Sequence, residues 1–205
     1  MSIMKNSITA SSITSEKSVM DAAKSNPIFG FYDELSTSSN NLTRYSESRF
    51  EQSQISKVAQ WFLAKESMSH KKLQKLCYYA YAWFIVFFND RESAPAHLAT
   101  LCPTGFEAWV HGPVCSELYR NYKGFGWSDI PASGKQVTFS ADMTDLLEQV
   151  WHTYGSFSAD QLEQLTHSEL PWKAARKGKK SDEPSTKKID DHLIFQYYSE
   201  MMGNE

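Results

Sequence analysis

The chain lacks a hydrophobic run long enough to cross a bilayer. Its longest apolar run, from Leu76 to Phe88, falls well short of the roughly 20 residues that a membrane-spanning helix requires, and the flank that precedes it is strongly polar. The N-terminal residues contain no apolar stretch of the kind that a signal peptide needs. We therefore expect a cytoplasmic protein with no membrane partner, in which this run forms a buried helix.

Cysteine is scarce, and neither sign of charge dominates. The chain has 3 cysteines, and an odd number without CxxC spacing argues against a closed disulfide framework and fits a reducing compartment. Its 21 basic and 24 acidic residues leave a net charge of -3. Charge of this size gives no reason to expect a nucleic-acid-binding protein.

The common motifs of catalysis and cofactor binding are also missing. There is no glycine-rich phosphate loop, no GxSxG and no HExxH, so we predict no enzyme, no catalytic residue and no cofactor. Two weaker alternatives stay open. The first is a zinc site, and the second is a Cys115 nucleophile with His111 as its base, on a helix whose dipole would lower the pKa of Cys115. The four residues that could ligate zinc are His97, Cys102, His111 and Cys115. Their spacing is not that of a standard zinc finger, so we favour a packing role and predict no metal site.

What the chain does contain is enough apolar surface for a core, placed after a long polar segment. Hydrophobic residues make up 41% of the 205 residues and aromatic residues 14%. Residues 1–52 are rich in Ser, Thr and Asn without a sustained period, which predicts a disordered or partner-docking extension before a domain over residues 53–202. An aromatic island in the extension offers Phe29, Phe31 and Tyr32 as anchors for a partner.

Apolar periodicity predicts a mainly helical domain. An amphipathic helix begins at Ile55 and ends near Met68. The next helix, capped by Ser69, is apolar nearly all round in its second half, so we place it at the centre of the fold. Ser140 and Ser158 are expected to cap two later helices, the second through a capping box with Gln161. A last helix is predicted over 189–201.

A small β element is predicted beside these helices. Residues 105–110 and 135–139 both read as extended, and we expect them to form a hairpin element. Between them, Pro113 follows a turn and is placed to start a helix that ends near Tyr122. The predicted fold class is mainly α: a compact helical domain around a central buried helix, with a small β-hairpin element.

Several aromatic residues lie in or beside loops and indicate a protein-binding face. Aromatic residues carry much of the binding energy at protein interfaces, and binding residues concentrate on loops. The basic run over 173–180 is followed at once by acidic residues and is expected to be a solvated loop, so direct DNA binding is not expected. The loop aromatics are Trp109, Tyr119, Phe125, Trp127 and Trp172.

Three short motifs follow one another along the predicted domain. They read SHKKLQKLCYYAYAW at 69–83, FEAWVHGPV at 106–114 with ELY at 117–119, and LTHSELPWK at 165–173. Together they resemble the Panacea domain of SocA-like antitoxins and phage-associated proteins, over about residues 55–202. Some relatives carry an N-terminal helix-turn-helix, which this chain lacks.

The resemblance implies the antitoxin of a type II toxin–antitoxin system, which binds a cognate toxin protein directly and holds it inactive. Two alternatives remain: a proteolytic adaptor that delivers the toxin to an ATP-dependent protease, and a prophage-encoded interaction protein without a toxin partner. Some members are known only as prophage-borne proteins, and a phage-defence context is in keeping with the resemblance. For partner binding we select Trp109, His111, Tyr119, Trp127 and Trp172, together with the three anchors of the extension, although Trp109 and Tyr119 could instead hold the fold.

Overall fold

The computed structural model describes residues 53–89 and 98–203. The predicted extension, with Phe29, Phe31 and Tyr32, lies outside these residues, and so does His97. Within the described part of the chain, none of the helices combines the length and the apolar character needed to cross a membrane.

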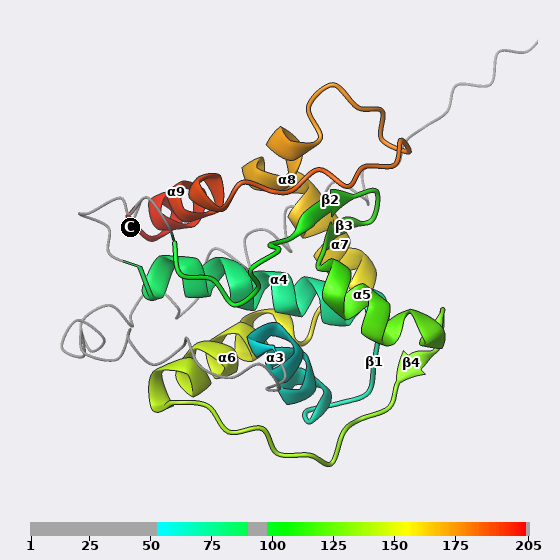
Figure 1. Ribbon diagram of the computed structural model, residues 1–205, viewed down its shortest axis with the longest axis vertical. Helices are drawn as coiled ribbons and strands as arrows, with labels where there is room; N and C mark the ends of the chain where they lie inside the picture. The colour runs from blue at the N-terminus through cyan, green and yellow to red at the C-terminus, as the bar shows by residue number, and fades with distance from the viewer. Residues whose placement is uncertain (1–52, 90–97, 204–205) are drawn as a thin grey trace, which may run out of the picture.

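One helix forms the centre of the domain. Helix α4 (His70–Phe87) begins after Ser69, whose side chain accepts a hydrogen bond from the backbone N–H of Lys72, and it is buried from Leu73 to Val86. Figure 1 shows α4 crossing the middle of the molecule with other helices on either side. An apolar stretch without a polar face has to be surrounded. The predicted central helix, its cap and the mainly α fold class are thus confirmed.

The surrounding helices each present an apolar side to α4. They are α3 (Gln54–Leu63), α6 (Ala141–Tyr154), α7 (Ala159–Ser168) and α9 (Asp191–Gly203). Ser140 caps α6, and Ser158 forms the predicted capping box with Gln161 at α7. The first helix is shorter than predicted: it ends at Leu63, because Met68 and Ser69 form strand β1 (Met68–Ser69), which pairs with β4 (Asp129–Ile130).

The hairpin is present, but with a different second strand. Strand β2 (Glu107–Trp109) pairs antiparallel with β3 (Gly112–Val114), and the exposed or half-buried residues 135–139 form no strand. The predicted helix start at Pro113 is wrong, since α5 (Ser116–Tyr122) begins only after Cys115. Gly112 has a φ of +93°, which lets the chain reverse within the hairpin and continue extended.

The basic run differs from its prediction at one residue. Helix α8 (Leu170–Ala175) is followed by Arg176, whose side chain is buried and donates hydrogen bonds to backbone carbonyls. One acceptor is Ala108 of β2, at 3.1 Å, and others lie in the loop that follows α8. Arg176 is therefore structural and not solvated, whereas the neighbouring lysines of the run are exposed.

Candidate functional site

A cavity of about 730 Å³ opens beside the N-terminal half of α4. Its walls come from α4, the β2–β3 hairpin, α5, the short helix η3 (Lys123–Phe125), the start of α7 and the segment around Pro184. Four of the aromatic residues and histidines selected from the sequence line it: Trp109, His111, Tyr119 and Trp127. Residues distant in the chain therefore meet around a single hollow.

Trp127 is the most exposed large apolar side chain among the described residues. Its side chain is 96% exposed, and it follows Gly126, whose φ of +57° turns the chain after η3. Tyr119 and Phe125 are also partly exposed. Full exposure of an indole ring leaves apolar surface in water that a partner could bury.

Trp109 and Tyr119 form an aromatic wall. Their ring centroids lie 4.8 Å apart, and Tyr119 also stacks on His70 at 5.5 Å. The indole of Trp109 donates a hydrogen bond to Glu107 over 2.7 Å, which fixes the ring. Both residues thus hold one another in place and also line the cavity.

Trp172 does not line the cavity. Its indole N–H donates to the Trp109 carbonyl over 3.1 Å, and its ring stacks on His167 with centroids 3.9 Å apart. Arg176 lies over the same ring at 5.2 Å. Trp172 therefore supports the backbone of β2, which forms part of the cavity wall.

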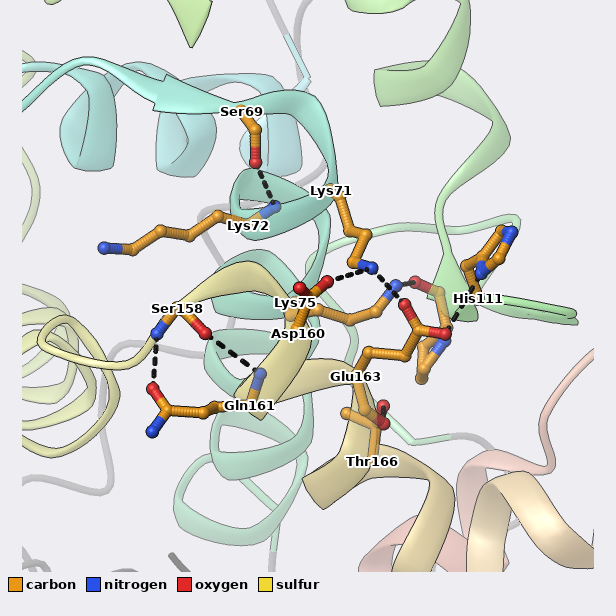
Figure 2. A network of polar contacts seen from close by, with 11 residues as sticks. Ser69, Lys71, Lys72, Lys75, His111, Ser158, Asp160, Gln161, Glu163 and Thr166 are labelled. Carbon is orange, nitrogen blue, oxygen red and sulfur yellow. Dashed lines mark hydrogen bonds and ion pairs between the residues drawn. The ribbon is translucent and has the colours of Figure 1, made fainter. Parts of the chain in front are cut away.

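A cluster of charged side chains lies beside the hairpin, at the start of α4 and α7 (Figure 2). Lys71 forms ion pairs with Asp160, at 2.7 Å, and with Glu163. His111 donates from Nδ1 to Glu163 over 3.0 Å. Burial raises the pKa of Glu163, but its hydrogen bonds with Lys71 and His111 outweigh burial and bring the pKa below its ordinary value. Glu163 is thus an ionised carboxylate that is already bonded to Lys71 and His111.

Lys75 is a buried lysine at the cavity wall. Its side chain is 1% exposed, and its ammonium donates to the Pro113 carbonyl over 3.0 Å. Burial lowers the pKa of Lys75 to about 7, and the charge of Glu163 acts in the opposite direction. The neighbouring Gln74 accepts from the Cys115 backbone N–H over 2.9 Å and donates to its carbonyl over 3.3 Å. Two polar side chains of α4 thus fix the hairpin and the start of α5.

The hairpin turn leaves no room for a side chain at Gly112. A Cβ there would lie 2.6 Å from Lys75 Cε and 2.9 Å from Thr166 Oγ1. Glycine is therefore required for the positive φ and also for the approach of the lysine.

A buried carboxylate joins α4 to the C-terminal helices. Glu169 accepts hydrogen bonds from the hydroxyls of Tyr79, at 3.0 Å, and Tyr198, at 2.7 Å. Burial raises the pKa of Glu169 to about 7, against the effect of both hydroxyls. This clamp lies in the core and holds the start of α8 against α4 and α9.

The cysteine arrangement does not form the catalytic pair considered above. The Cys102 and Cys115 sulfurs lie 3.4 Å apart in the core, while His111 bonds to Glu163. Cys115 precedes α5, and the pKa of its thiol is raised, first by the hydrogen bond to Cys102 and then by burial. The expectation of a lowered pKa at Cys115 is wrong. Among residues 53–89 and 98–203, no three His, Cys, Asp or Glu side chains are grouped to hold a metal ion.

Sequence reasoning missed Gln74, Lys75, Glu163 and Arg176. A signal for the first two exists, because they are polar residues between Leu73 and Leu76 on an otherwise apolar helix. A buried polar side chain needs a partner, so both residues had to meet something. The partner itself, the β3–α5 backbone, could not be identified from the helix alone.

These features define a mainly helical domain with an aromatic-lined cavity beside its central helix. Residues 73–173 match the family model described as antitoxin SocA-like, Panacea domain. The resemblance to the Panacea domain of SocA-like antitoxins is thus confirmed over these residues. No curated protein and no solved structure matches the chain.

The matched region contains several of the side chains that hold the hairpin wall of the cavity. The first motif supplies Gln74 and Lys75, the second forms the hairpin, and the third supplies Trp172. The three motifs therefore contact one another in the folded domain, through bonds from side chains to the hairpin backbone.

Proposed function

We propose that this protein is the antitoxin of a type II toxin–antitoxin pair and that it neutralises its toxin by direct binding, without catalysis. The observation that carries the proposal is the match of residues 73–173 to the SocA-like Panacea family, whose description supports an antitoxin-like role. The cysteine content, odd in number and without CxxC spacing, favours a reducing cytoplasmic setting.

The proposed contact surface is the aromatic rim of the cavity. A specific complex buries about 1,200–2,000 Å², with a few central aromatic side chains contributing most of the binding free energy. Trp127 is suited to this role because it is almost fully exposed before any partner binds. Tyr119, Trp109 and His111 would complete the surface around it.

The test is co-expression with each small open reading frame adjacent to the gene, scored by growth and then by co-purification. We expect one neighbour to be toxic alone, harmless with this protein, and recovered with it at fixed stoichiometry. If no neighbour is toxic, the antitoxin proposal is refuted. The half-life of the toxin in the presence of this protein separates a stable inactive complex from delivery to a protease.

A Trp127→Ala variant tests the contact surface. The side chain contacts little in the free protein, so the melting temperature should stay unchanged while toxin affinity falls at least thirtyfold, as expected for an interface hot spot. Leu170→Ala is the matched control, since Leu170 is an exposed large apolar residue that does not line the cavity. Full rescue by Trp127→Ala would place the interface elsewhere.

The N-terminal extension remains a second proposed contact, through Phe29, Phe31 and Tyr32. Deletion of residues 1–50 should weaken toxin binding while the melting temperature of the domain is retained. Unchanged affinity and rescue would show that the extension takes no part.

A further inference from the structure

The charges at the cavity are unbalanced. Of the residues that the structure describes, three lysines line it, Lys71, Lys75 and Lys123, against one carboxylate, Asp160. The chain as a whole carries a net charge of -3, so this positive excess is local. A cavity of one sign attracts a ligand group of the other sign.

Lys71 is bonded to carboxylates, whereas Lys75 lies within the field of Glu163 but is bonded to no carboxylate among the described residues. Lys71 is paired with Asp160 and Glu163, and Glu163 also accepts from His111. Within the described part of the chain, the acceptor bonded to the Lys75 ammonium is the Pro113 carbonyl, which satisfies one of its three N–H groups. In Figure 2 the Lys75 side chain extends from α4 toward Glu163, whose oxygens are bonded to other groups.

A buried ammonium that is not bonded to a counter-charge destabilises a protein unless something else compensates it. Lys75 also lines the cavity, so a bound group can reach it. We propose that this cavity binds an acidic side chain of the protein partner, with the Lys75 ammonium as its counter-ion and the neighbouring partner residues packed on Trp109, Tyr119 and Trp127. The inference rests on the proposed function for the identity of the partner.

The chemistry of the cavity favours a carboxylate over a phosphate. A phosphate carries up to two charges and three acceptor oxygens, and proteins bind it with several donors, often arginine. Here one buried lysine lines the cavity, and no arginine of residues 53–89 or 98–203 does. The aromatic walls suit the apolar residues that flank an acidic side chain in a peptide segment, and about 730 Å³ is in the range of pockets that bury a small ligand.

The site can be tested without the toxin by using two small probes of the same shape. 4-Phenylbutyrate and 4-phenylbutyramide are titrated into the full chain labelled with ¹³C-lysine, and the pKa of Lys75 is followed by NMR. An opposite charge within about 4–6 Å raises the pKa of a lysine by about one to three units, so the acid should raise the pKa of Lys75 and the amide should leave it in place. Equal effects of the two probes, or a stronger effect of inorganic phosphate, would overturn the inference.

Matched variants separate a specific site from general attraction. Lys75→Met should lower affinity for the acid at least tenfold, and so should Lys75→Gln, which keeps a donor for the Pro113 carbonyl. Lys123→Met removes an exposed lysine of the same cavity and should change affinity less than threefold. If Lys123→Met weakens binding as much as Lys75→Met, the cavity attracts anions only through its overall charge and the inference is wrong.

The complex with the toxin then tests whether an acidic side chain of the partner contacts Lys75. Each Asp and Glu of the co-purifying toxin is changed to Asn or Gln and combined with Lys75→Met in double-mutant cycles. One acidic residue should couple to Lys75 by at least tenfold. A toxin that binds with no coupled acidic side chain, or that couples only through its C-terminal carboxylate, overturns this inference and leaves the antitoxin proposal standing. If no toxin exists, the antitoxin proposal fails, and the probe titration still decides on the site.

Discussion

Replacement of Glu169 by Gln should change how the stability of the domain depends on pH. Glu169 is a buried carboxylate that accepts from two tyrosine hydroxyls, and its pKa is about 7 in the folded chain against an ordinary value of 4.5. Between these two pH values the folded chain holds a proton that the unfolded chain has released. The free energy of unfolding therefore falls as pH rises through this window.

The size of the effect follows from the two pKa values. Each pH unit across the window lowers the free energy of unfolding by ~1.4 kcal/mol, so the wild type should lose about 2 to 3 kcal/mol between pH 5 and pH 8 through this residue. A glutamine has no ionisable group, and either tyrosine hydroxyl can reverse to accept from its amide N–H. The Glu169→Gln variant should lack this part of the pH dependence.

The assay is urea unfolding of the full chain at pH 5, 6, 7 and 8. We expect the stability of Glu169→Gln relative to the wild type to rise steadily over this range. Glu148→Gln is the control, because it removes a half-exposed carboxylate from the surface of α6 and should give no such trend. Parallel pH profiles for the wild type and Glu169→Gln would refute the reasoning, because Glu169 would then ionise as easily folded as unfolded.

Two further predictions concern the cavity wall. Lys75→Met should reveal the opposite trend. Burial lowers the pKa of Lys75 to about 7, so above pH 7 the folded chain binds fewer protons than the unfolded chain. In urea unfolding, the free energy of unfolding of the wild type should therefore rise by about 2 kcal/mol relative to that of the variant between pH 7 and pH 9. Lys72→Met, which removes an ion-paired lysine from the same helix, should give a flat difference. Gly112→Ala should lower the free energy of unfolding by about 2 to 4 kcal/mol, because the new Cβ meets Lys75 and Thr166 at a positive φ. Gly124→Ala, where nothing lies within 4 Å, should cost less than about 1 kcal/mol, and equal losses at the two glycines would contradict the close approach.

The elements that sequence predicts correctly are those set by local interactions. Ser69, Ser140 and Ser158 cap their helices through bonds to backbone groups three residues ahead, and such bonds are visible in a short stretch of sequence. Helix α4 is predicted because an all-round apolar segment of that length must be buried.

The errors come from contacts between distant parts of the chain. Pro113 is well placed to start a helix by local rules, but its carbonyl is held by Lys75 and the chain stays extended for two more residues. Arg176 stands in a basic run and reads as solvated, and only the fold brings backbone carbonyls to its guanidinium. The aromatic residues were identified by type and loop position, whereas their convergence on one cavity depends on how α5 and the hairpin dock on α4.

The way in which the hairpin is held bears on how this fold can diversify. Side chains from α4 and from the α8 region secure main-chain atoms: Arg176 and Trp172 bind carbonyls in β2, Lys75 binds one in β3, and Gln74 binds Cys115. Main-chain atoms are the same whatever residue carries them. The turn residues Val110 and His111 can therefore be exchanged without dismantling the scaffold, and mutation can retune recognition at little cost to folding. A helical domain built in this way is well suited to follow a partner that changes its own surface over evolutionary time.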